Sequence, residues 1–526
     1  MTATAQTARR VLSRPQRLWT PLPILSAVVA VVAIILSKGA LVSVALWGFA
    51  TFALVLAIGP PIPAMVMLIV VSSLDGIFKG VATGWFTLLF KDIVLWLAVI
   101  RWLGMRQAGL YAKVPRVSSI YLMVVFVLWV CAEGVSIFST SWLAAFAGIR
   151  TWVGWMPAFF VAYEGIRERR DVALLWLSIV VTAGLVGLYG VVQQSLGYGH
   201  LLAISSGFSY VDRTRLGGGS YRAISTLAHP GIFGHFMATV LPVGLAFFLA
   251  RLLPSRHRLL SGAAALGMAG GALASGGRLA TASLLTCGVL FILLSRQARA
   301  VFIGIIVFAA VGVIAVHLVA PQSVRRVSSL FQLDATLDRV VHPLRQGWRA
   351  IREHPFGTGV ATGVGIGRAA RFLGGVEIQV EASGMIEGDY GRAFRELGLP
   401  GGLLFLYLVG HVLWRGLVLQ RRIQHRGWRV VSAALFAVLF SEVLGLAVGP
   451  SFYLMPVAGL FWLAYASLLR LAQLTPGLEG LGPEPDLAQA EAHGEAAARE
   501  QVEPQSQTER PADAPAESAP EADDSH

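Results

Sequence analysis

The sequence predicts an all-α polytopic membrane protein with about fourteen transmembrane helices. Its 526 residues are 56% hydrophobic and 13% charged, and the mean hydropathy is +0.68. Soluble domains carry about 25% charged residues, so lipid is the expected solvent for most of the chain. Apolar runs recur that approach the roughly 20 residues needed to span a hydrocarbon core. Backbone groups in lipid are satisfied only within helices or closed barrels, and runs of this length predict helices.

The chain divides into a basic N-terminus, a membrane domain and an acidic tail. Residues 1–22 are basic, and no small-residue cleavage site follows the first apolar run, so we expect a retained helix rather than a secretory signal. Residues 23–470 form the expected membrane domain. Residues 471–526 hold 13 acidic and 2 basic residues, among many Ala, Pro and Gln. This tail is predicted to be disordered because it has too little apolar surface to offset its ordering entropy.

The apolar runs give the order of the expected spans. We expect them at residues 23–37, 41–58, 61–74, 84–100, 118–138, 146–163, 173–192, 230–250, 259–274, 278–295, 300–319, 399–419, 430–448 and 451–470. Cys131 and Cys287 both fall inside such runs, so neither a disulfide framework nor a thiolate metal site is indicated.

Basic residues predict the orientation of these spans. If the N-terminus is cytoplasmic, the inside loops are all basic, as the positive-inside rule requires. These loops are residues 101–116, 167–170, 251–258, 296–299 and 421–429. Two long segments, 197–228 and 320–399, are then outside, and both termini are cytoplasmic.

The second outer segment is itself rich in arginine, which the positive-inside rule does not explain. Arg345, Arg349 and Arg352 recur at i, i+4 and i+7, so a helix there carries three guanidinium groups on one face, with Pro343 suited to its first turn. Guanidinium groups pair with phosphate oxygens and keep their charge, which makes the stripe a candidate diphosphate clamp. The alternative is an ordinary amphipathic helix on the membrane surface.

Ionisable residues within spans are a second functional signal, because charge inside a membrane is costly. Asp75, Glu133, Arg150, Arg278 and Glu442 all map to the outer halves of their helices and are expected to line one outward-facing cavity. The alternative is that they sit at the interface or pair for structural reasons. The adjacent Lys91 and Asp92 do not share a helix face and are weak signals.

Carboxylates and a glycine-rich turn follow the arginine stripe. The turn at residues 354–359 matches neither the Walker pattern nor a dinucleotide fingerprint, and we expect a flexible turn. Glu387 or Asp389 is a candidate general base for an attacking hydroxyl. Ordinary ion pairing with Arg392 or Arg395 is the equal alternative.

The first outer segment ends in a further group of polar residues. Arg222 is a candidate anion ligand, together with Arg278 of Gly276-Gly277-Arg278. His229, which comes just before the next span, is a second candidate base. The Ser, Thr and Pro residues around it equally suit the start of a helix.

Four motifs together resemble the O-antigen ligase and O-antigen polymerase superfamily of bacterial envelope enzymes. The resemblance covers residues 222–453, in the right order and with the long loop in the right place. The motifs are RAISTLAHPGIFGHF from Arg222, GGRLATASLL from Gly276, RQGWRAIREHPFGTG from Arg345 and DYGRAFRELGLPGG from Asp389.

This resemblance implies a GT-C-like membrane glycosyltransferase of the bacterial cytoplasmic membrane. It implies transfer of a glycan from an undecaprenyl-diphosphate carrier to an acceptor sugar at the outer face, without nucleotide sugar, metal or cofactor. Ligases of the family carry a histidine just before the motif that begins here at Asp389, and this chain has none between His354 and His411. A polymerase of exopolysaccharide, capsule or O-antigen is therefore expected rather than a ligase acting on lipid A core.

Roles and partners follow from the same resemblance. Arg222 and Arg278 match basic positions of the family, and Arg345 and Arg349 fall in its loop helix. The donor and the acceptor are both lipid-linked glycans, and a chain-length regulator or a flippase is the expected protein partner. No nucleic acid is expected. A transporter or flippase for lipid-linked glycan is the alternative of a different class.

Overall fold

The computed structural model describes most of the membrane domain. The described residues are 21–36, 40–81, 85–111, 117–135, 142–204, 208, 222–295, 333–360, 362, 388–449, 452 and 455–475. They form helices joined by short connections and include no strand, which confirms the all-helical prediction for this part of the chain. The expected span at 300–319, residues 476–526 and Glu387 lie outside the described residues.

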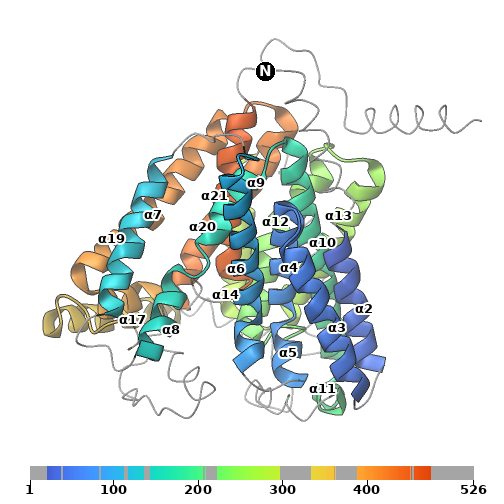
Figure 1. Ribbon diagram of the computed structural model, residues 1–526, viewed down its shortest axis with the longest axis horizontal. Helices are drawn as coiled ribbons and strands as arrows, with labels where there is room; N and C mark the ends of the chain where they lie inside the picture. Colours follow the sequence, from blue (N-terminus) through green and yellow to red (C-terminus); the bar gives the residue numbers. More distant parts are fainter. Residues whose placement is uncertain are drawn as a thin grey trace, which may run out of the picture.

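The helices follow one another along an upright bundle (Figure 1). The first half comprises α2 (Leu22–Leu36), α3 (Ala40–Ala57), α4 (Pro61–Ser73), α5 (Asp75–Val81), α6 (Trp85–Gln107), α7 (Ser118–Gly134), α8 (Trp142–Val153), α9 (Pro157–Gly165), α10 (Arg169–Leu196) and α11 (Tyr198–Ile204). The second half comprises α12 (Pro230–Leu249), α13 (Ser255–Ala274), α14 (Arg278–Leu294), α17 (Leu333–Glu353), α19 (Asp389–Arg422), α20 (Arg426–Val448) and α21 (Val457–Leu474).

Five of the described helices are long and apolar enough to cross a membrane. They are α10, α12, α19, α20 and α21. The helices α4 and α5 form a sixth candidate if they are one span, bent by 51°. The expected span at 146–163 is instead broken between α8 and α9. The structure therefore supports a polytopic membrane protein, and the count of fourteen stays a prediction.

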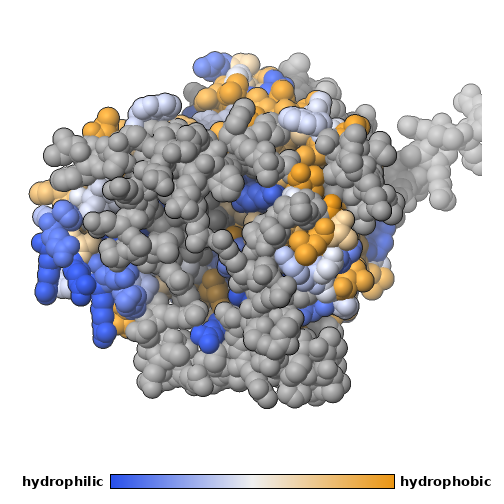
Figure 2. Space-filling view, turned by 90° about the horizontal axis from the view of Figure 1, so that it is seen from below, coloured by the Kyte–Doolittle hydropathy of each residue, from blue (hydrophilic) through white to orange (hydrophobic). Residues whose placement is uncertain are grey.

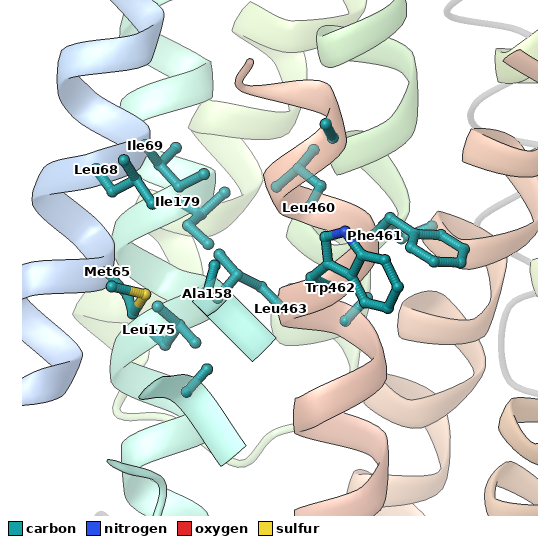
Figure 3. Close-up of a cluster of buried hydrophobic side chains, with 14 of the residues drawn as sticks. Met65, Leu68, Ile69, Ala158, Leu175, Ile179, Leu460, Phe461, Trp462 and Leu463 are labelled. Carbon is teal, nitrogen blue, oxygen red and sulfur yellow. The ribbon is translucent and has the colours of Figure 1, made fainter. Parts of the chain in front are cut away.

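The bundle is apolar both inside and outside, as expected of helices in lipid. Every residue of α4 is buried. Its side chains pack against those of α10, and α9 and α21 complete the same cluster (Figure 3). Large apolar side chains are nonetheless exposed on the outer helices, for example Leu25, Tyr121, Leu293 and Tyr407. An exposed apolar belt around an apolar core is typical of a protein whose solvent is lipid.

The basic connections gather at one end of the bundle, which we call the basic-loop end. Arg106 pairs with Glu164 at 3.2 Å, and Arg167 donates a hydrogen bond to the Leu110 carbonyl at 3.1 Å. Arg169 donates to the Leu474 carbonyl at 3.2 Å. The loop before α7, the loop before α10 and the end of α21 are therefore neighbours, although they are far apart in the sequence.

The opposite end, which we call the α17 end, carries the arginine stripe. Helix α17 lies across the lower ends of the upright helices in Figure 1 and packs on the start of α19. A Cβ added at Gly347 would lie 3.0 Å from the Gly391 carbonyl oxygen, so the two helices touch through glycines. The helix begins at Leu333, and Pro343 lies inside it on the buried face. The prediction that Pro343 occupies the first turn is wrong, because contact with α19 outweighs the hydrogen bond that a mid-helix proline loses.

The glycine-rich turn after α17 is held in place rather than flexible. Gly398 adopts φ +67° and breaks the helical geometry of α19, which frees carbonyls of the preceding turn. The Thr358 N–H donates to the Arg395 carbonyl at 2.9 Å, and the Leu399 N–H donates to the Pro355 carbonyl at 2.8 Å. A Cβ at Gly357 would lie 2.6 Å from the Glu396 carbonyl oxygen. Residues 355–359 are therefore bound to α19, because its kink supplies hydrogen-bond partners that local sequence does not reveal, while Gly363, Gly365 and Gly367 lie outside the described residues.

The two ends of the bundle are expected to lie on opposite sides of the membrane. We predict that cysteines introduced as Trp348→Cys and Arg256→Cys, after Cys131 and Cys287 are replaced by Ala, react with a membrane-impermeant maleimide from opposite faces. Labelling of intact spheroplasts and of inverted vesicles measures this, since both positions are exposed. Labelling of both from the same side would contradict the arrangement of the two ends.

Candidate functional site

Arg222 lies against the segment that leads into Arg278. Its Nε donates to the Ser275 carbonyl at 2.9 Å, and the Ala223 N–H donates to the Ala274 carbonyl at 3.2 Å. A Cβ added at Gly277 would lie 3.4 Å from the Arg222 guanidinium, so glycine allows this close approach. The structure thus brings together two motifs that are about fifty residues apart.

The Arg222 loop is fixed by Gln193 of α10, which sequence reasoning did not single out. The Gln193 side-chain oxygen accepts from the Ile224 N–H at 2.9 Å and from the Ser225 N–H at 2.8 Å. Its side-chain nitrogen donates to the Ser225 carbonyl at 3.3 Å. Ser225 has φ +54°, a strained value that these bonds support. Gln193 lies just beyond the expected span at 173–192 and is followed by Gln194, so local sequence gave no signal that distinguished it.

His229 caps helix α12. Its Nδ1 accepts the Gly231 N–H at 3.0 Å, while the side chain is exposed at the α17 end. Helix-start chemistry was one of the two interpretations of this segment, and the geometry matches it. As a base, His229 would have to give up this cap or act through its other ring nitrogen.

The arginine stripe lies on the exposed face of α17. Arg345, Arg349 and Arg352 are all exposed, whereas Gly347 and Ala350 are buried toward α19. The Arg352 guanidinium lies 5.6 Å from the ring centroid of Trp348, which is itself 57% exposed. Figure 2, a view of this end of the molecule, shows hydrophilic side chains projecting at the edge where α17 lies. The three guanidinium groups are therefore open to a ligand.

The arginine stripe lies at the same end of the bundle as Arg222 and Arg278, but on a different element. We call these last two residues together the Arg222–Arg278 pair. Helix α17 packs on α19 and α20, and α20 in turn packs on α14, which begins with Arg278. The Tyr390 hydroxyl donates to the Val443 carbonyl at 2.9 Å and so joins α19 to α20 at this level. The two arginine groups therefore flank the start of α19 and the end of α20, both at the α17 end.

Asp389 is buried and bound on both carboxylate oxygens. It is fully buried, its Oδ2 accepts the Phe452 N–H at 2.8 Å, and its Oδ1 lies 3.5 Å from Arg392. Ion pairing with Arg392 was the alternative interpretation, and this is what the structure contains. Glu387 lies outside the described residues.

Arg392 lies at the centre of a buried charge cluster that joins α19 to α8. Its Nε donates to Glu396 at 3.0 Å, and its guanidinium lies 4.4 Å from the Trp152 ring centroid and also binds Thr151. The Trp152 indole N–H donates to the second oxygen of Glu396 at 2.7 Å. The carboxylates of Asp389 and Glu396 are therefore both paired with the Arg392 guanidinium.

The intramembrane charges are divided among separate sites rather than one cavity. Glu442 pairs with His235 at 3.3 Å, and the other ring nitrogen of His235 bonds to Ser283 at 2.8 Å. Asp75 and Arg150 belong instead to ion pairs on α5, α6 and α8. The expectation of a single cavity is not met within the described residues, because Asp75, Arg150 and Glu442 are each paired within one of these separate groups. Glu133 is buried near the end of α7, and Arg278 is half-buried at the start of α14. No three His, Cys, Asp or Glu of these residues gather closely enough to hold a metal ion.

Comparison with known proteins leaves the family of this chain open. No protein-family model matches the sequence, and no curated protein matches it. The functional assignment therefore depends on the chemistry of the site and on the motifs.

We predict that Arg392→Leu is more destabilising than removal of the entire charge cluster. The single change leaves two buried carboxylates without their cation and should cost about 3–5 kcal/mol. The triple variant Asp389→Asn, Arg392→Leu, Glu396→Gln leaves no buried charge and should be more stable than the single variant. Thermal unfolding of the purified proteins in detergent measures both. A triple variant that melts below the single variant would contradict this account.

Proposed function

We propose that the chain is a membrane glycosyltransferase that polymerises undecaprenyl-diphosphate-linked oligosaccharide units at the outer face of the bacterial cytoplasmic membrane. The observation that carries the proposal is the position of the exposed stripe, Arg345, Arg349 and Arg352, at the same end of the bundle as Arg222 and Arg278. Five guanidinium groups at one membrane surface suit a lipid diphosphate, since each pairs with phosphate oxygens and none loses its charge.

The orientation follows from the opposite end of the bundle. The basic-loop end is assigned to the cytoplasm by the positive-inside rule, so the α17 end faces outward. Energy for the transfer must then reside in the lipid-linked donor, because nucleotide sugars are cytoplasmic. The motif order that resembles the O-antigen ligase and polymerase superfamily supports the same orientation.

The proposed reaction is an inverting transfer that needs no metal. A hydroxyl of the acceptor sugar attacks the anomeric carbon of the donor, the bond to the diphosphate oxygen breaks, and the lipid diphosphate leaves with the bonding electrons. The arginines stabilise the charge that develops on the diphosphate, and preorganised electrostatics of this kind is often the largest contribution to rate. The hydroxyl proton passes to a base or to water. Glu387, Asp389 and His229 are the candidate bases, and Asp389 would have to give up its bond to Arg392 or to the Phe452 N–H to take the proton.

A lipid-linked glycan transporter is the second candidate, favoured by the 51° bend between α4 and α5. Broken helices of this kind occur at the binding sites of many transporters. The deciding experiment is the purified protein in detergent with a lipid-linked oligosaccharide. Longer glycan formed without any membrane gradient would establish the enzyme, and unchanged substrate would favour the transporter.

We predict that Arg349→Ala, Arg222→Ala and Arg278→Ala each lower polymer formation on the order of a hundredfold, the size of effect seen when a transition-state donor is lost. Lipid-linked repeat units should accumulate in cells carrying these variants. Arg256→Ala is the matched control, because it removes one exposed guanidinium from the basic-loop end. Polymer length and turnover are the measurements, and wild-type values in the three variants would refute the assigned roles.

A further inference from the structure

Five charged side chains form a second buried cluster at the α17 end, on α5, α6 and α8. They are Asp75, Lys79, Lys91, Asp92 and Arg150. Asp75 accepts from Lys79 through Oδ2 and from Lys91 through Oδ1, the latter at 3.0 Å. Asp92 accepts from Arg150 through both oxygens, each at 2.7 Å. We call this group the α5–α6–α8 cluster.

The cluster holds more positive than negative charge. Its three cations meet two carboxylates, and each of the four carboxylate oxygens already accepts a hydrogen bond from a cation. When both lysines are charged, one positive charge is therefore left without a counterion among the described residues of the cluster. Charge inside a membrane protein is normally paired, because the low dielectric makes an uncompensated ion expensive. The cluster is one anion short of neutrality.

Lys79 and Arg150 are the accessible members of the cluster. Their side chains are 33% and 25% exposed, whereas those of Lys91 and of both carboxylates are 11% exposed. Each ammonium group has donors beyond those given to Asp75, and the second terminal nitrogen of the Arg150 guanidinium is not used by Asp92. The donors of Lys79 and Arg150 are therefore more exposed than the carboxylate oxygens, while Lys91 lies as deep as the carboxylates.

The backbone around the cluster is rigid and tied to the Arg222 loop. The Gly76 N–H donates to the Thr226 carbonyl at 2.9 Å, and the Thr226 hydroxyl donates to the Ser73 carbonyl at 2.6 Å. A Cβ at Gly76 would lie 2.3 Å from the Leu227 carbonyl carbon, so only glycine fits there. On the other side, the Arg150 guanidinium lies 5.8 Å from the Trp155 ring centroid. The donors are therefore preorganised, which lowers the entropic cost of binding.

We propose that the α5–α6–α8 cluster is a binding site for a phosphate-type oxyanion, held by Lys79, Lys91 and Arg150. The ligand supplies the missing negative charge, and its tetrahedral oxygens suit the ammonium and guanidinium donors that α5, α6 and α8 supply. The oxyanion comes either from a phosphorylated lipid or from a free phosphate. The site is distinct from the Arg222–Arg278 pair and from the α17 stripe, and it does not depend on the proposed reaction.

The test is a charge-balance series measured by binding rather than activity. Purified full-length protein in detergent at low ionic strength is titrated with inorganic pyrophosphate and, separately, with farnesyl diphosphate. All variants carry Arg222→Gln, Arg278→Gln, Arg345→Gln, Arg349→Gln and Arg352→Gln, so that neither Arg222 and Arg278 nor the stripe contributes. Calorimetry and the ligand-dependent shift in melting temperature are the readouts.

Lys79→Met makes the cluster neutral and should weaken binding of both probes on the order of tenfold or more, as expected for loss of a charge-assisted bond. Lys79→Met combined with Asp92→Asn restores the net positive charge and frees Arg150, so affinity should return. Lys79→Arg keeps the charge and should bind like the parent. A merely structural cluster would not show this rescue, because the double variant breaks a second ion pair.

Two outcomes separate the sources of the oxyanion, and one overturns the proposal. Tighter binding of farnesyl diphosphate than of pyrophosphate assigns the site to a phosphorylated lipid, and equal binding assigns it to free phosphate. If Lys79→Met and the double variant both bind the probes as tightly as the parent, the cluster does not bind the oxyanion. If Lys79→Met fails to fold, the Lys79→Arg and Asp92→Asn variants still test the proposal. Lys79→Arg should bind the probes like the parent, and Asp92→Asn alone should bind them more tightly.

Discussion

Three consecutive residues of α8 connect the two charged regions of the α17 end. Arg150 binds Asp92 of α6, while Thr151 and Trp152 contact Arg392 and Glu396 of α19. Charges at this depth must be paired, because the surrounding dielectric is low. A single turn of α8 therefore fixes the outer ends of the first and second halves of the bundle relative to each other, and the arrangement of the arginines depends on it.

Glycines at close contacts make this arrangement rigid. Gly76 lies against the Leu227 backbone, Gly347 against Gly391, and Gly398 against the turn that follows α17. Larger residues would separate these elements, so the backbone spacing is set by the absence of a side chain. Rigid elements carry the arginines, and a rigid set of donors stabilises developing charge without the cost of reorganisation.

The α17 end thus has two kinds of cationic surface with different physical properties. The α17 stripe is exposed and lies beside Trp348, as expected for a helix at the interface between lipid headgroups and water. The α5–α6–α8 cluster is deeper and shielded, so its charge is less screened by salt. An anionic ligand would thus meet an exposed surface on α17 and a partly shielded one between α5, α6 and α8.

Local sequence was sufficient to predict the helical class, most of the helix positions, the grouping of the basic loops and the arginine stripe. These features follow from hydropathy, charge and helical periodicity, which are properties of neighbouring residues. Only tertiary contacts decided which partner each polar side chain binds. Asp389 is bound by a backbone N–H 63 residues away, and Arg392 contacts a threonine 241 residues away. Lys91 and Asp92 point to different partners, Asp75 and Arg150, so their adjacency gave no signal of the cluster they form. A side chain is a ligand, a base or a structural ion according to what faces it, and those neighbours come from distant parts of the chain.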